Sequence, residues 1–208
     1  MKGLFITFEG GEGVGKSTLI QRINKKLSES HSIFITREPG GTELGEQIRF
    51  LLKHVNLKID PKTELLLFSA ARAQLFTNKI QPQLDANQIV LSDRFFDSTI
   101  VYQGYARGLD LTIIRQLNTF VTNARSPDMT FLILADKQTT QNVQERGGIA
   151  CRFDAEPETF HDKVHRGFEE LAKIESRIIQ IPYIHNGLEQ MEKMIMDKIL
   201  KHPFFHIT

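Results

Sequence analysis

The segment that most constrains this chain is a glycine-rich turn at residues 10–17, which reads Gly-Gly-Glu-Gly-Val-Gly-Lys-Ser. It matches the pattern G-x-x-x-x-G-K-[ST] and stands between an apolar run, residues 4–8, and a helical pattern that begins at Thr18. Glycines let backbone N–H groups curl around phosphate oxygens, and the following helix adds a partly positive N-terminus. A strand, this turn and a helix together predict a phosphate-binding loop (P-loop).

Two side chains of this loop have chemical roles. Lys16 is expected to reach the β and γ phosphates, and the hydroxyl of Ser17 can ligate Mg²⁺. A merely flexible glycine turn is the alternative, and the flanking strand and helix disfavour it. We therefore expect ATP as phosphoryl donor and Mg²⁺ as cofactor. The nucleotide-binding residues are expected to be Gly10, Gly11, Glu12, Gly13, Val14, Gly15, Lys16, Ser17 and Thr18.

Strands and helices alternate along the rest of the chain. Further short apolar segments lie at residues 32–36, 89–92, 129–135 and 178–181, and helical periodicity separates them. Helices are expected to begin at Pro61 (running to about Ile80), after the cap Asp110, at Pro157 and at Gly187. Because parallel strands need long crossovers, the alternation predicts a three-layer α/β fold, a mostly parallel five-stranded sheet with helices on both faces. Its site should lie beyond the carboxyl ends of the strands.

Length and composition limit the alternatives. We expect 208 residues to form one domain, residues 1–208. A formal charge of +1 lacks the cationic excess of a protein that grips nucleic acid mainly by charge. Apolar runs are far shorter than the roughly 18 residues that span a bilayer, so no membrane partner is expected. The lone Cys151 and the lack of a signal-peptide apolar region near the start favour the cytoplasm.

Two other strand ends carry polar residues. Val90-Leu91-Ser92-Asp93-Arg94 would place Asp93 near the metal and phosphates, so Ser17 and Asp93 are the expected metal ligands. A solvated ion pair is the alternative for Asp93 and Arg94. Arg37-Glu38-Pro39-Gly40-Gly41 follows another strand, and its glycines permit close approach of backbone or ligand, although an ordinary turn would need nothing more.

A planar base could be held by two residues of the helix that begins at Pro61. Phe68 and Arg72 are four apart and share one face, where an aromatic ring and a bidentate cation would lie together. A core Phe beside an exposed Arg is the alternative. Farther along, the segment 146–156 combines Gly147-Gly148 with charged residues and is expected to form a lid.

With these pieces in order, the sequence resembles the bacterial thymidylate kinases, P-loop nucleoside monophosphate kinases that make dTDP from dTMP and ATP in dTTP biosynthesis. The resemblance covers nearly the whole chain and rests on segments 8–18, 36–42, 67–72, 92–95 and 102–108. It implies transfer of the ATP γ-phosphoryl group to dTMP, with Mg²⁺, by an enzyme that forms homodimers.

The resemblance also implies roles for individual residues. Phe68 would stack on thymine, Arg72 would hydrogen-bond its carbonyl edge, and Tyr102 would crowd the place of a ribose 2′-hydroxyl. The expected substrate-binding residues are Glu38, Arg49, Phe68, Arg72, Arg94, Ser98, Thr99, Tyr102 and Gln103. Within this set, Thr99 and Gln103 complete the base site and Arg94 holds the dTMP phosphate. Glu9 would orient the acceptor and metal.

One departure concerns the transition state. Some thymidylate kinases carry an arginine inside the P-loop, whereas this chain has Glu12, so the cation is expected from the lid, from Arg146 or Arg152. The expected catalytic residues are Lys16, Arg94, Arg146, Arg152 and Glu9.

Two other functions stay open at this point. A kinase for another nucleoside monophosphate or metabolite would carry the same P-loop, since the loop reports ATP and not the acceptor. A GTPase-like switch would normally carry Asn-Lys-x-Asp, but the nearest string, Asn78-Lys79-Ile80-Gln81, lacks the Asp.

Overall fold

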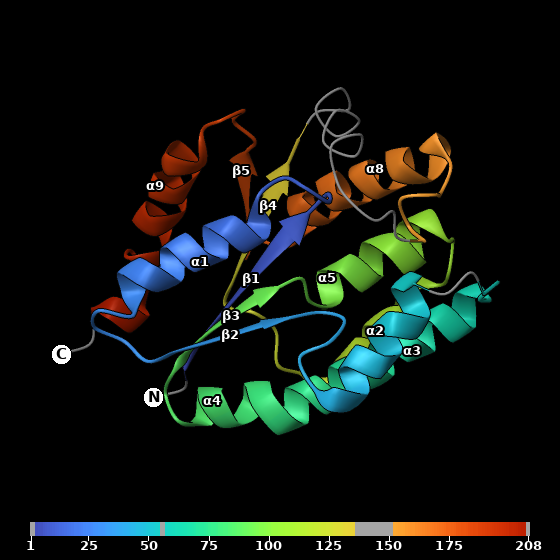
Figure 1. Cartoon of the computed structure of the whole chain (residues 1–208), viewed down its shortest axis with the longest axis horizontal. Helices are drawn as coiled ribbons and strands as arrows, with labels where there is room; N and C mark the ends of the chain where they lie inside the picture. Colours follow the sequence, from blue (N-terminus) through green and yellow to red (C-terminus); the bar gives the residue numbers. More distant parts are fainter. Residues whose placement is uncertain (1–2, 55–56, 136–151, 207–208) are drawn as a thin grey trace.

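The computed structural model describes residues 3–54, 57–135 and 152–206 (Figure 1). Its centre is a five-stranded sheet in the order β2-β3-β1-β4-β5, and every neighbouring pair is parallel. The strands are β1 (Leu4–Gly10), β2 (Ile33–Arg37), β3 (Ile89–Asp93), β4 (Met129–Leu134) and β5 (Ile178–Pro182). The five-stranded parallel sheet predicted from the sequence is therefore confirmed.

Helical segments connect the strands. In the described parts of the chain they are α1 (Lys16–Leu27), α2 (Glu43–His54), α3 (Pro61–Leu75), η1 (Phe76–Ile80), α4 (Gln81–Asp85), α5 (Phe96–Thr99), η2 (Ile100–Ala106), α6 (Leu111–Val121), α8 (Glu158–Ile174), α9 (Leu188–Ile199) and η3 (Pro203–Phe205).

The sheet separates two apolar cores, and the central strand shows why. Leu4, Ile6 and Phe8 of β1 face one core, whereas Phe5 faces the other, because successive side chains of a strand point to opposite faces. The first core holds the apolar faces of α1 and α9, and the second holds those of α3, α6 and α8. Helices thus cover both faces, as the sequence predicted.

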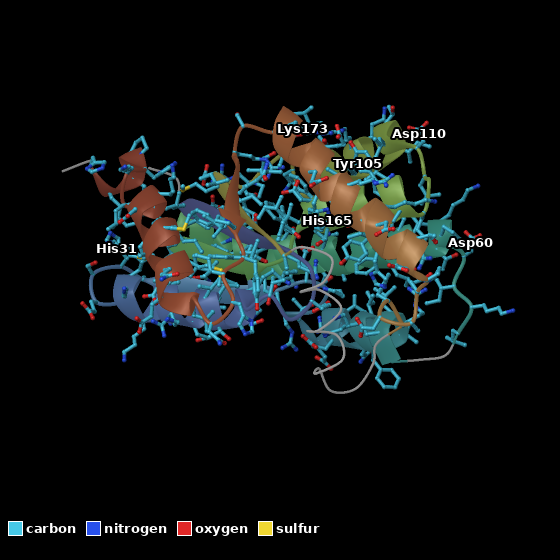
Figure 2. All side chains as sticks on the ribbon, turned by 90° about the horizontal axis from the view of Figure 1, so that it is seen from above. His31, Asp60, Tyr105, Asp110, His165 and Lys173 are labelled. Carbon is cyan, nitrogen blue, oxygen red and sulfur yellow. The ribbon has the colours of Figure 1, made fainter. Side chains whose placement is uncertain are left out.

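Two helix starts follow from local sequence. Asp60 and Asp110 lie at the beginnings of α3 and α6 (Figure 2). Asp60 Oδ1 accepts the N–H of Lys62 at 2.9 Å, and Asp110 Oδ1 accepts the N–H of Thr112 at 2.7 Å. These caps satisfy donors that the first helical turn leaves free, so the cap predicted at Asp110 is confirmed.

The predicted end of the helix from Pro61, near Ile80, was wrong, since helical structure continues to Asp85. Pro82 would normally clash with the carbonyl four residues earlier and end an α-helix. Here the backbone widens into the π-helical segment η1, and the N–H of Gln81 donates to the carbonyl of Phe76, five residues back. The wider turn accommodates Pro82, so the helix passes through it.

The strand register brings the three polar strand ends together. Phe8 of β1 is level with Asp93, and Arg37 of β2 is level with Asp93 on the other side of β3. The P-loop, the Asp93-Arg94 pair and the turn at Glu38 therefore share the carboxyl edge of the sheet, where ligands bind in such folds. No helix within the described ranges is long and apolar enough to cross a membrane.

Candidate functional site

The P-loop has a backbone that only glycine can follow at its start. Gly10 has φ of 131°, and a Cβ there would lie 2.0 Å from the carbonyl oxygen of Ile133. The side chain of Lys16 turns back into the loop, where its Nζ donates to the carbonyl of Gly10 at 3.2 Å and to that of Gly11. Burial, helped by the charge of Arg94, lowers the pKa of Lys16 to about 8. The loop is therefore preformed around a cation that is ready for an anionic ligand.

The two expected metal ligands lie in contact. Ser17 Oγ donates to Asp93 Oδ2 at 2.6 Å, across the gap between the P-loop helix and the end of β3. A hydroxyl and a carboxylate are the oxygen ligands that Mg²⁺ prefers, with phosphate and water completing its shell. These residues fit the ion that the sequence predicted.

Arg94 lies at the centre of the site. It adopts a left-handed backbone with φ of 72°, which is costly for a non-glycine residue and is held here by an N–H bond to the carbonyl of Phe8 at 2.9 Å. Its guanidinium donates to Ser98 Oγ at 3.0 Å and to Glu12 Oε1 at 3.3 Å, and it lies 5.5 Å from the centroid of the Tyr102 ring. The unusual backbone thus aims a cation between the P-loop and the residues expected to bind the acceptor.

Glu9 is buried beneath that cation. Its carboxylate accepts the backbone N–H of Phe95 at 2.8 Å and that of Ser98 at 3.3 Å, and Ser98 Oγ donates to it at 2.6 Å. Burial, with the nearby charge of Asp97, raises the pKa of Glu9 to about 7, although Arg94 opposes the change. Glu9 therefore fixes the turn that carries Arg94 and Ser98.

The acidic P-loop residue has two cationic neighbours. Glu12 Oε1 lies 3.3 Å from Arg94 Nη2 and 3.4 Å from Lys53 Nζ, a residue of α2. Arg94 above all holds the pKa of Glu12 well below its usual range. Glu12 thus faces the side of the P-loop on which Arg94 and Lys53 lie.

Arg72 is engaged by the protein itself. Its Nε and Nη2 donate to one oxygen of Glu38 at 2.8 and 2.6 Å, Nη2 also donates to Thr99 at 2.9 Å, and Nη1 donates to Asn118 at 3.1 Å. Burial raises the pKa of Glu38, while the Arg72 charge opposes that change. Four of the five guanidinium N–H groups are therefore occupied, which leaves one N–H of Nη1 for a ligand.

One cavity, with an empty volume of about 920 Å³ that is partly open to solvent, is bordered by Glu12, Glu38, Lys53, Arg72 and Arg94. Of the nine expected substrate-binding residues, eight line it: Glu38, Phe68, Arg72, Arg94, Ser98, Thr99, Tyr102 and Gln103. The ninth, Arg49, instead donates to the carbonyl of Pro39 at 2.8 Å and so holds the turn that follows β2. Gly11 and Glu12 also line the cavity, which joins it to the P-loop.

An aromatic wall closes one side of the cavity. The ring of Phe153 lies 6.0 Å from that of Phe68 and 5.9 Å from that of Tyr102, in an edge arrangement with Tyr102. His165 of α8 also borders this cavity (Figure 2). The rings of Phe68, Tyr102 and Phe153 thus form a packed aromatic wall that lines the cavity.

Of the two expected lid arginines, Arg146 lies outside the described residues, as do residues 147–151 of the lid segment. Arg152 is described, and its side chain is tied to the protein body. It pairs with Glu64, and its Nε donates to the carbonyl of Leu52 at 3.1 Å.

Sequence reasoning missed several residues of this site. Lys53 lies one helical turn after Arg49, and that spacing could have drawn attention to it. Phe153 directly follows an expected lid residue, but nothing in the sequence places its ring opposite Phe68. Glu64 and Asn118 have no functional signal in the sequence, because the side chains that they contact are distant in sequence.

The chain is similar to known thymidylate kinases over most of its length. The sequence model of the family described as Thymidylate kinase matches residues 8–195. The thymidylate kinase of Syntrophotalea carbinolica is 42% identical over 195 residues, 90% of each chain, and that of Carboxydothermus hydrogenoformans is 46% identical over 175 residues, 83% of this chain and 86% of the other. A crystal structure of thymidylate kinase from Ehrlichia chaffeensis matches with a TM-score of 0.77 and 34% identity, covering 96% of this chain and 99% of that one.

Proposed function

The chain belongs to the thymidylate kinase family, and we propose that it transfers the γ-phosphoryl group of ATP to dTMP between its P-loop and the cavity described above. One observation carries the assignment of the site. Eight residues that the sequence associated with the acceptor come from α3, α5, η2 and the ends of β2 and β3, yet they border a single cavity that reaches Gly11 and Glu12. The product is dTDP, in the biosynthesis of thymidine nucleotides.

The acceptor half of the site would hold dTMP by stacking and charge. The thymine ring would stack on Phe68, Tyr102 would crowd the place of a ribose 2′-hydroxyl, and the 5′-phosphate would lie against Arg94. Because Arg94 already lies beside Glu12, it can face the acceptor phosphate on one side and the P-loop on the other. Its charge would offset the repulsion between two polyanions brought together.

The donor half would hold the ATP phosphates on backbone N–H groups of the P-loop. Lys16 leaves the carbonyls of Gly10 and Gly11 and turns to the phosphates, whose negative charge stabilises the positive form of its amine and so opposes the lowered pKa. Mg²⁺, when bound, would neutralise charge on the β and γ phosphates, and Ser17 with Asp93 are the residues that would hold it. The acceptor oxygen is already anionic or nearly so, so positioning and cations rather than a strong base provide the rate.

Arg146 and Arg152 stay candidates for the transition-state cation. Arg152 pairs with Glu64, so its use in catalysis would require release from that partner. Lys53 is the described cation that already faces Glu12 across the cavity, which makes it a further candidate beside Arg94.

We expect the active form to be a homodimer in the cytoplasm. Large apolar side chains are exposed on three helices that pack against one another, α2 with α3 and α3 with α6. They are Leu44, Phe50, Leu51, Leu66, Ile113 and Phe120. Phe120 is 79% exposed, which is unusual for a large ring unless a partner covers it. Sedimentation of the wild type and of Phe120→Asp tests this proposal. If the aspartate does not weaken the dimer, the interface does not include Phe120.

The assignment of the site is tested by calorimetric titration with dTMP. Arg94→Ala should weaken dTMP binding at least tenfold, because a charge-assisted contact to phosphate is lost. Arg22→Ala is the control, because Arg22 pairs with Glu192 on the far side of the sheet. This variant should bind dTMP as tightly as the wild type. Equal affinities for all three proteins would remove Arg94 from the acceptor site.

A further inference from the structure

A fully buried carboxylate next to the cavity has no role in the mechanism above. Glu64 of α3 has no solvent-exposed surface, yet it does not line the cavity. Three side chains from outside α3 donate to it: Gln103 Nε2 at 2.8 Å, Arg107 at 3.2 Å through both Nε and Nη2, and Arg152 through Nη2. Removing one carboxylate and two guanidinium groups from water carries a large desolvation penalty, so the residues that Glu64 contacts indicate its role.

One of its partners is a residue of the cavity wall. Gln103 lines the cavity and is 1% exposed, so its amide has little room to move. A carboxylate without a proton only accepts hydrogen bonds, so it must face the amide nitrogen and not the amide oxygen. A reversed amide would place two acceptor oxygens in contact. Glu64 therefore fixes which way the amide points and leaves the oxygen of Gln103 as an acceptor for a ligand.

A second partner belongs to the aromatic wall. Arg152 pairs with Glu64, its backbone N–H donates to the carbonyl of Lys53 at 3.2 Å, and its guanidinium lies 4.7 Å from the centroid of the Phe153 ring. Glu64 thus anchors the segment that carries Phe153 against Phe68 and Tyr102. The same carboxylate therefore holds two parts of the cavity wall, the amide of Gln103 and the segment that carries Phe153.

We propose that Glu64 is a positioning residue that determines base selection in the acceptor site. This inference rests on the proposed function. An acceptor oxygen at Gln103 suits a base with an N–H at position 3, as in thymine and uracil, and opposes cytosine, whose N3 is itself an acceptor. A site built to bond an N–H rejects the analogue that lacks it, because its own polar group is left unpaired. Discrimination between dTMP and dCMP therefore depends on Glu64, which touches neither.

The test is the ratio of kcat/KM for dTMP to that for dCMP. Glu64→Gln can donate as well as accept, so both orientations of the Gln103 amide become possible and the ratio should fall about tenfold, the value of one hydrogen bond. A role in folding alone would lower both constants together and leave the ratio unchanged. Glu156→Gln removes the other carboxylate of Arg107 but not the partner of Gln103, and Glu170→Gln alters an exposed acid; both should keep the ratio.

Glu64→Asp keeps the test decisive if Glu64→Gln does not fold. Asp is one methylene shorter, so its carboxylate no longer reaches the amide of Gln103 and the ratio should fall in this variant too. An unchanged ratio in either folded variant overturns the inference. The proposed function fails separately, in the wild type, if dTMP is not phosphorylated at all.

Discussion

Removing the cation from the buried pair of Arg72 and Glu38 should destabilise the protein more than any exposed ion pair could. Arg72 is 1% exposed and donates twice to Oε2 of Glu38. The other carboxylate oxygen, Oε1, is buried without a hydrogen-bond partner among the described residues. Arg72→Met would leave a buried carboxylate without compensation, which typically costs about 3–5 kcal/mol. That loss is a large part of the roughly 5–15 kcal/mol that stabilises an ordinary domain. It should shrink as the pH falls, because protonation of Glu38 removes the uncompensated charge.

A double-mutant cycle separates this pair from its surroundings. Glu38→Gln alone leaves Arg72 bonded to Asn118 and Thr99 and should cost about 1–3 kcal/mol. In the double variant no buried charge is left unpaired, so the combined loss should be smaller than the sum of the single losses by more than about 1 kcal/mol.

The assay is urea unfolding at neutral pH without nucleotides. The matched control is Lys173→Met with Glu170→Gln, an exposed pair whose atoms lie 2.7 Å apart and whose two substitutions should show almost no coupling, because solvent screens the pair. If the Arg72 cycle gives no more coupling than this control, the buried pair does not stabilise the fold and this reasoning is refuted.

Three further outcomes are expected. Because the pKa of Glu9 in the folded protein, about 7, exceeds its ordinary value of 4.5, wild-type stability should fall as the pH rises between these values, by about 3 kcal/mol in all. Glu9→Gln should lose that slope in urea unfolding from pH 5 to 8, and equal slopes in the two proteins would contradict this. Because the pKa of Lys16 is lowered to about 8, kcat/KM for ATP should decline as the pH rises through 8. Lys16→Ala should nearly abolish phosphoryl transfer in a folded protein, and wild-type turnover in that variant would refute the role of Lys16. Phe68→Ala should weaken dTMP binding by about 1–3 kcal/mol by calorimetry with ATP affinity unchanged, whereas a lower melting temperature with normal dTMP affinity would mark a core residue.

The fold was predictable because its signals are local. The apolar run that contains Leu4, Ile6 and Phe8 predicts a strand, and Asp110 predicts the start of a helix within a few residues. The helix through Pro82 was not predictable, since the π-helical turn that accommodates this proline has no pattern of its own in the sequence. Helix α2 had no named counterpart among the expected helices, and with it Lys53 was missed.

The site was predictable where a residue belongs to a motif and unpredictable where it only supports one. Ser17 and Asp93 were expected together, and they lie in contact. Glu64 meets Gln103 and Arg152 only because three segments far apart in sequence converge. The role of a buried acid is inferred from the side chains that it contacts, and a single sequence does not show which distant residues those are.

The most direct test of the account is a coupled ADP-release assay with ATP and Mg²⁺ across dTMP, dUMP, UMP, CMP, AMP and GMP. Stacking on Phe68, together with an acceptor oxygen on Gln103, predicts the highest kcat/KM for dTMP and far lower values for CMP and the purine nucleotides. A purine nucleotide or CMP phosphorylated as efficiently as dTMP would contradict the assignment of this cavity as a thymidylate site.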